Sequence, residues 1–289
     1  MGTTTENLEL PAEIRAALER QIENRELELP ALPEVANRVV SACFDPECDL
    51  ARLVQIIETD AFMSGHLLRV TNSALYSPPR PITSLQHALS LLGLNQTRDV
   101  ALRVSLEHRI FQIRGCEQRA RELFEHAHDT ALISRELSSL LHLEEDEAFL
   151  CGLLHDIGRP VLLQAIDDLR IRQGIKSRRR LELAPAVMEA AATEYHTEVG
   201  ARLIENWNLP ARFTEVPRYH HDPDAAPDPS TLTRIVCLAN DLAHFTRAAF
   251  GLTRSSILEH SQLEPLGIDP AMLDPMLDRL DATLASHSR

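Results

Sequence analysis

Apolar residues recur at three- and four-residue steps along nearly the whole chain, and this spacing constrains the fold more than any other feature of the sequence. In residues 61–75, for example, Met63, Leu67 and Val70 follow the period of an amphipathic α-helix. No stretch shows the sustained alternation of apolar and polar residues that half-buried β-strands require. Only ten glycines occur in 289 residues, which suits helices with short connections, so we predict an all-α fold.

Helix-capping signals divide this pattern into separate elements. A capping-box spacing at residues 83–86 begins one helix, and Gly93 ends it. Asn95 then caps a further helix that runs to about Phe111. The same periodicity predicts helices over 117–141, 145–155, 187–207, 229–250 and 270–285.

The charge of the chain limits the partners that it can bind. With 29 basic and 43 acidic residues, the net charge is −14, which argues against a broad grip on nucleic-acid phosphates. The densest basic cluster comprises Lys176, Arg178, Arg179 and Arg180. Because like-charge runs usually point into water, this cluster is either a solvated loop or a contact for a phosphate or an acidic partner.

The sequence shows neither a targeting signal nor a membrane span. Residues 1–30 are polar and acidic and lack the apolar core of a signal peptide. No run of about 18 apolar residues occurs, and the five cysteines form no CxxC pair. We therefore expect a cytoplasmic protein with reduced thiols and no membrane partner.

One interruption of the helical pattern suits a junction between two lobes. Residues 114–116, Arg-Gly-Cys, break the periodicity and precede a long, charged helix. We predict a helical extension over residues 1–24, a first helical lobe over 25–115 and a second helical lobe over 116–289.

His155 and Asp156 stand side by side at the end of an apolar run. Adjacent residues of a helix diverge by about 100°, so the two side chains do not bind one ion as a pair on one face. They can border one cavity, however, and a carboxylate can bridge two metal ions. Glu122 and His126 have the i,i+4 spacing that places two ligands on one helix face.

Further residues of ligand type are His196, His220, His221 and Asp241, the last inside an otherwise apolar stretch. Thirteen histidines leave room for coincidence, and spacing between helices informs only if the fold brings them together. From the residues alone, a His/Asp metal centre and a set of structural histidines both remain open.

A series of motifs between residues 25 and 250 closely resembles the HDOD domain family. The motifs are LPALPEV at 29–35, DA at 60–61, LRVTNSALY at 68–76, RPITSLQHALSLLGL at 80–94, AFLCGLLHDIG at 148–158 and HTEVGARLIENWNLP at 196–210. HDOD proteins are all-helical bacterial signalling modules, related in their second lobe to the HD superfamily of metal-dependent phosphohydrolases. The resemblance implies a two-lobed helical fold with an HD-like C-terminal lobe.

The resemblance also implies a ligand set. In the metal-binding branch of the superfamily, an early His, a His-Asp pair, a later His, a His pair and a final Asp surround a two-metal centre. The matching residues here are His126, His155, Asp156, His196, His220, His221 and Asp241. Glu122 matches an extra acid of three-metal HD-GYP members, and His128 is an alternative to His126. Two divalent ions of Fe, Mn, Ni or Zn are the implied cofactor, because imidazole suits these metals.

Two departures from the superfamily pattern bear on activity. The lysine that often follows the His-Asp pair is Arg159 here, which can clamp a phosphate with a different geometry. After His221 the chain reads Asp-Pro-Asp-Ala-Ala without a Gly-Tyr-Pro signature, which disfavours cleavage of cyclic-di-GMP.

Two functions follow from the resemblance. The first is a signal-transduction module that keeps a metal site and binds a protein partner through its helical lobes. The second is a metal-dependent phosphohydrolase, in which two ions activate a water at Asp156, Arg159 steadies the developing charge, and a small phosphorylated ligand is the substrate. A nucleic-acid-binding regulator, based only on the basic cluster, ranks last.

Overall fold

A computed structural model describes residues 12–73, 76, 78–113, 116–172, 185–228, 230–247 and 251–287. Within these ranges the chain is helical and contains no β-strand, so the predicted all-α fold is confirmed. The basic residues Arg178, Arg179 and Arg180 lie outside the described residues.

The helices follow one another with short connections. In chain order they are α1 (Ala12–Glu23), α2 (Glu34–Cys43), α3 (Leu50–Ile57), α4 (Ala61–Thr71), α5 (Leu85–Arg109), α6 (Glu117–Leu140), α7 (Glu145–Leu154), α8 (Gly158–Arg172), α9 (Pro185–Asn206), α10 (Arg212–Tyr219), the 3₁₀ helix η1 (Pro223–Ala225), α11 (Thr231–Thr246), α12 (Arg254–Leu258), α13 (Leu263–Leu266) and α14 (Pro270–His287).

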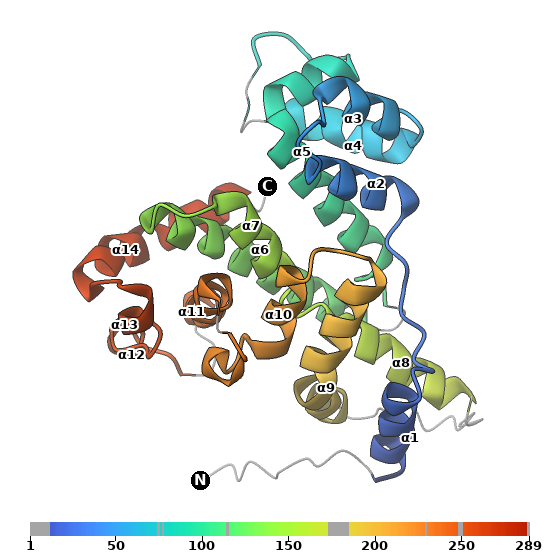
Figure 1. The fold of residues 1–289 in the computed structure, drawn as a ribbon, viewed down its shortest axis with the longest axis vertical. Coiled ribbons are helices and arrows are strands. Elements are labelled where there is room, and N and C mark those ends of the chain that lie inside the picture. The colour runs from blue at the N-terminus through green and yellow to red at the C-terminus, as the bar shows by residue number, and fades with distance from the viewer. Residues whose placement is uncertain are drawn as a thin grey trace.

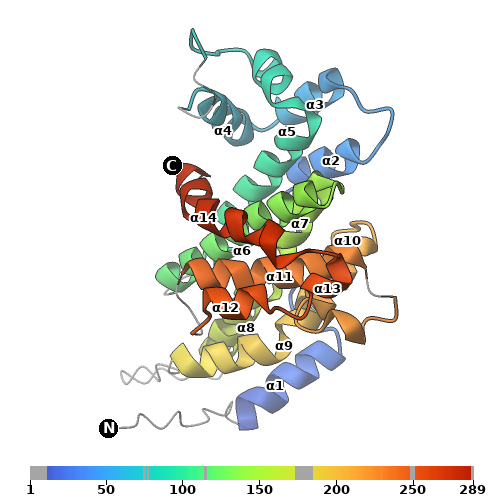
Figure 2. The same cartoon turned by 90° about the vertical axis from the view of Figure 1, so that its left-hand side faces the viewer.

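Buried apolar side chains form two clusters along the molecule. The smaller cluster lies among α2, α3, α4 and much of the length of α5, at the top of Figure 1. The larger one unites α6 to α14 with the end of α5 and with Leu18 and Ile22 of α1. Helix α5 therefore contributes to both clusters and carries the first against the second (Figures 1 and 2).

A glycine bends α5 where the sequence predicted a break. Gly93 has φ 75° and ψ 175°, a backbone conformation that a residue with a Cβ rarely adopts. The helical segment before it begins at Ser84, whose side chain accepts a hydrogen bond from the amide of His87. The kink separates the two predicted helices, which the structure joins as one bent element.

The N-terminal helix and its linker are tied to the larger cluster by polar contacts. The hydroxyl of Tyr195 on α9 donates to Glu19 of α1 at 3.1 Å. Trp207 is buried, and its indole nitrogen donates to the carbonyl oxygen of Pro30 at 2.8 Å. Figure 2 shows α1 lying along α9.

One helical stretch among the described residues, Glu145–Leu169, is long and apolar enough to cross a membrane. Its most apolar window is 89% buried inside the protein, as in the core helix of a helical bundle. This burial arises because α7 packs between α6, α10 and α11 (Figure 1).

Candidate metal centre

The His155-Asp156 pair lies in the turn between α7 and α8, at the centre of the larger cluster. Two glycines let the backbone of this turn approach its neighbours. A Cβ on Gly152 would lie 2.7 Å from Cα of Ala131 on α6, and a Cβ on Gly158 would overlap the carbonyl oxygen of His196 on α9. Gly152 and Gly158 therefore let the turn pack closely between α6 and α9, and the side chains of His155 and Asp156 are buried there.

Four potential ligands converge on one side of this turn. The Oδ1 atom of Asp156 lies 3.2 Å from Nε2 of His196 and 3.5 Å from Nε2 of His220. Nε2 of His196 also lies 3.0 Å from Nε2 of His221. The ligand atoms of these four residues all lie within 4.8 Å of one another. We call Asp156, His196, His220 and His221 the four-ligand group.

Backbone carbonyls orient three of the histidine rings. Nδ1 of His155 lies 2.7 Å from the carbonyl oxygen of Gly152. Nδ1 of His196 lies 2.7 Å from that of Ala192, and Nδ1 of His220 lies 3.0 Å from that of Pro217. A carbonyl oxygen only accepts, so each Nδ1 carries the proton and donates. In a neutral ring the lone pair is then on Nε2, which is the arrangement of metal-binding histidines.

The electrostatics keep the ligands in the protonation state that a cation requires. Burial lowers the pKa of His155 and of His196 to about 4, and that of His221 to about 3, so these rings are neutral at pH 7. Burial alone would raise the pKa of Asp156, but the surrounding basic groups, among which Arg159 is permanently charged, outweigh it and hold the pKa well below its usual range. The carboxylate is therefore ionised.

A second group lies on the other side of Asp156. Its members are His126, His155 and Asp156, again with ligand atoms within 4.8 Å. Nε2 of His155 lies 3.6 Å from Oδ2 of Asp156, and the rings of His126 and His155 are 5.3 Å apart. His126 and not His128 faces this group, because His128 contacts Phe149 and belongs to a different cavity.

Asn240, and not the expected ligand Asp241, faces His126. Asn240 of α11, only 5% exposed, places Oδ1 2.9 Å from Nε2 of His126. Asp241 points away, and its Oδ2 pairs with Nε2 of His260 at 3.1 Å. The predicted position is corrected because adjacent helical residues diverge by about 100°, so only one of the two can face the cluster.

The structure places Glu122 outside the cluster and Arg159 against it. Glu122 does not reach either group; its side chain is 44% exposed and bonds to Gln118 and Arg119 on the outer face of α6. Arg159 does reach the cluster, with Nε 2.7 Å from Oδ2 of Asp156 and Nη1 3.1 Å from Glu189.

Sequence reasoning missed His244, whose ring stacks on His126 at 4.3 Å between centroids. Asn240 and His244 have an i,i+4 spacing on α11, so they share a helix face. That spacing is the signal that identifies the inward face of this helix and excludes Asp241.

The residues present fit a bound cation. Nε2 of His155, Nε2 of His220 and Oδ1 of Asp156 are buried and make no hydrogen bond within the described structure. Unpartnered buried polar atoms are costly, and here they are the lone-pair atoms that a metal would take. Three imidazoles and one carboxylate would suit a transition metal.

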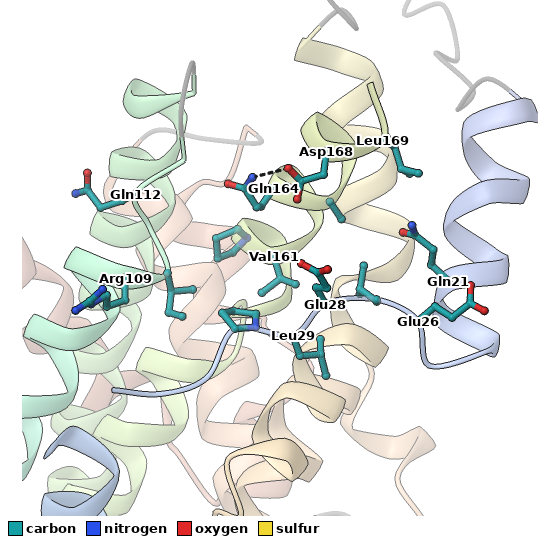
Figure 3. Close-up of a pocket in the computed structure, with 15 residues that line it drawn as sticks. Gln21, Glu26, Glu28, Leu29, Arg109, Gln112, Val161, Gln164, Asp168 and Leu169 are labelled. Atoms are coloured by element: carbon teal, nitrogen blue, oxygen red, sulfur yellow. Dashed lines mark hydrogen bonds between the residues drawn. The ribbon is translucent and has the colours of Figure 1, made fainter. Parts of the chain in front are cut away.

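A cavity also lies away from the ligand groups. Figure 3 shows a cavity of about 260 Å³ between the linker after α1, the end of α5 and α8, where Gln164 donates to Asp168 at 3.1 Å. None of the described residues that line it belongs to either ligand group.

The fold and the cluster place the chain in a class of all-α proteins with a His/Asp cluster in the core. The family model for the HDOD domain matches residues 29–223, so the chain belongs to the HDOD family. This match confirms the resemblance seen in the motifs.

Solved structures share the fold. A Geobacter sulfurreducens HDOD domain protein of unknown function is 22% identical, with a TM-score of 0.72 over 95% of this chain and 98% of its own. A Shewanella amazonensis protein named "Putative metal-dependent phosphohydrolase" is 22% identical, with a TM-score of 0.70 and the same coverage. A Marinobacter aquaeolei protein named "Putative signal transduction protein" is 22% identical, with a TM-score of 0.71 over 97% of this chain and 66% of its own.

One curated relative, an uncharacterized protein of Treponema pallidum, is 25% identical over 233 residues. The match covers 79% of this chain but only 44% of that relative. The chain therefore spans less than half of the length of this relative.

Proposed function

We propose that this protein is a signal-transduction module of the HDOD type that binds a divalent transition metal in its four-ligand group. The observation that carries the proposal is the convergence of the Nε2 atoms of two buried histidines, His196 and His220, on the ionised carboxylate of Asp156. Imidazole-rich ligation favours Fe, Mn, Ni or Zn over Mg or Ca. When bound, such an ion supplies Lewis acidity.

The residues around the group would report its state to the rest of the molecule. Arg159 links Asp156 to Glu189 of α9, and Glu189 also pairs with Arg119 in the first turn of α6. This chain of ion pairs reaches the start of the helix that follows α5. A change of charge at Asp156 therefore has a direct electrostatic route to the region between the two hydrophobic clusters.

A protein partner would bind the helices of the smaller cluster. Phe62 on α4 is 53% exposed and Leu91 on α5 is 44% exposed, so both can contact a partner. Phe62 packs edge-on against His108, so its position is fixed by a neighbour. These residues support a contact surface that is separate from the metal ligands.

A metal-dependent phosphohydrolase is the second candidate. The observation that favours it is Arg159, which lies against Asp156 and can bind a phosphate bidentately once released. In that function Arg159 would steady the charge of a small phosphorylated ligand, and Asp156 would hold the metal. The name of the Shewanella amazonensis relative is consistent with this chemistry but describes that protein.

Metal content and turnover separate these functions. We would purify the full chain anaerobically, measure bound metal, and assay hydrolysis of bis(p-nitrophenyl) phosphate. Asp156→Ala should abolish binding, whereas the matched control Asp241→Ala should retain it because Asp241 faces His260. Bound metal without turnover supports the module, and turnover that is lost in Asp156→Ala supports the hydrolase. A folded wild-type protein that takes up no transition metal would contradict both.

A further inference from the structure

The ligands are distributed unevenly around Asp156. Its Oδ1 atom faces the four-ligand group, whereas its Oδ2 atom faces His155 and Arg159. We propose that the centre binds a single metal ion, and that Arg159 and Asn240 exclude a second one. This inference rests on the proposed metal-binding function and departs from the two-ion centre that the family resemblance implies.

Arg159 already provides a positive charge in the second half of the centre, which is the group of His126, His155 and Asp156. Its Nε atom is 2.7 Å from Oδ2 of Asp156, its side chain is only 13% exposed, and Glu189 holds its other end at 3.1 Å. Asp156 is the only carboxylate in either ligand group among the described residues. Two divalent ions and a guanidinium would share one carboxylate in a buried site, where like charges repel strongly.

Asn240 removes the carboxylate that could balance a second ion. Its amide nitrogen lies 3.5 Å from Oδ1 of Asp241, an atom that only accepts, which orients the amide oxygen toward His126. That oxygen also only accepts, so Nε2 of His126 carries the proton and donates at 2.9 Å. The protonation of His126 is therefore opposite to that of His155, whose Nε2 is free of a proton.

His244 fills the space behind His126. Its ring lies 15° from parallel to the ring of His126, at 4.3 Å between centroids. Three contacts within the chain engage the other members of this group: a stacked imidazole pair, an imidazole–amide hydrogen bond and a carboxylate–guanidinium ion pair. Nε2 of His155 remains without a hydrogen bond within the described structure.

Two substitutions should allow a second ion to bind beside His126, His155 and Asp156. Asn240→Asp adds the missing carboxylate, and Arg159→Gln removes the competing guanidinium. The double variant should therefore bind two ions where the wild type binds one. The matched control is Asp241→Asn, which changes the neighbouring residue on the outer face of α11 and should still bind one ion.

The experiment loads the metal-free full chain with Mn²⁺, removes excess ion, and measures Mn per chain by mass spectrometry together with the electron paramagnetic resonance spectrum. We expect one equivalent and an uncoupled Mn²⁺ signal in the wild type. The double variant should give two equivalents and an exchange-coupled signal. His196→Ala should lose the ion, whereas His126→Ala should retain it.

The metal counts distinguish failure of the single-ion proposal from failure of the proposed metal-binding function. Two equivalents in the wild type, or loss of the single ion in His126→Ala, would overturn the single-ion proposal and leave the proposed function intact. A double variant that folds but binds one ion would overturn the role assigned to Arg159 and Asn240. A wild type that folds and binds none would overturn the proposed function. If circular dichroism shows that the double variant does not fold, the two histidine variants still decide the number of ions.

Discussion

Gly158 is the position where one added methyl group should do most damage to the metal centre. Its Cβ would overlap the carbonyl oxygen of His196 and lie 2.7 Å from the amide nitrogen of Gly200. Both are backbone atoms of α9, so no side-chain rotation relieves the clash. The helices α8 and α9 would have to separate.

The loss of stability expected for Gly158→Ala depends on the rigidity of the atoms that the added Cβ meets. Overpacking a core usually costs about 1 to 3 kcal/mol, and rigid backbone places Gly158→Ala at or above the upper end of that range. Gly65 is the control, because a Cβ there meets nothing within 4 Å. In the exposed interior of α4, Gly65→Ala should stabilise by roughly 1 kcal/mol through helix propensity.

Urea unfolding of both variants, followed by circular dichroism, measures the two free energies. Gly158→Ala should also weaken metal uptake, since it moves His196 away from Asp156. A loss below about 1 kcal/mol for Gly158→Ala, with normal metal uptake, would refute the close approach of α8 and α9.

Three other perturbations have defined outcomes. Trp207→Phe removes the hydrogen bond to Pro30 and should cost about 1 to 2 kcal/mol in urea unfolding; an unchanged midpoint would contradict the anchoring of the linker. Glu215 accepts hydrogen bonds from Ser230 and Thr233 that outweigh burial and lower its pKa. Its stabilisation is therefore present above the unfolded pKa of about 4.5 and is lost as the pH falls through the folded value, so Glu215→Gln should destabilise at pH 7 and progressively less as the pH falls below about 4.5. A chelator should lower the melting temperature of the metal-loaded wild type and leave Asp156→Ala unchanged, because only a ligand that binds the folded state stabilises it.

The sequence predicted the helical fold well because helix periodicity and caps are local signals. The kink at Gly93 and the helices α6, α7 and α14 lie close to their predicted bounds. Helices α8 and α10 are among those that the sequence did not predict. Helix α8 begins directly after the turn at Asp156, and α10 is short and contains Pro217, so neither has a clear start signal.

The candidate site was harder to predict at single-residue level. The ordered motifs suffice to nominate His155, Asp156 and His196, which the structure does bring together. The choice between Asn240 and Asp241 depends on which face of α11 is buried, and both residues are polar in one apolar run. The ion pair between Arg159 and Asp156 depends on a turn whose geometry only the tertiary structure shows.

The most direct test of the metal centre is anomalous X-ray diffraction from crystals of the metal-loaded protein, recorded at the absorption edge of the bound metal. We expect one peak within about 2.0 to 2.2 Å of Oδ1 of Asp156 and of Nε2 of His196, His220 and His221. A peak beside His126 and Asn240, or no peak in the core of a protein loaded with metal, would contradict it.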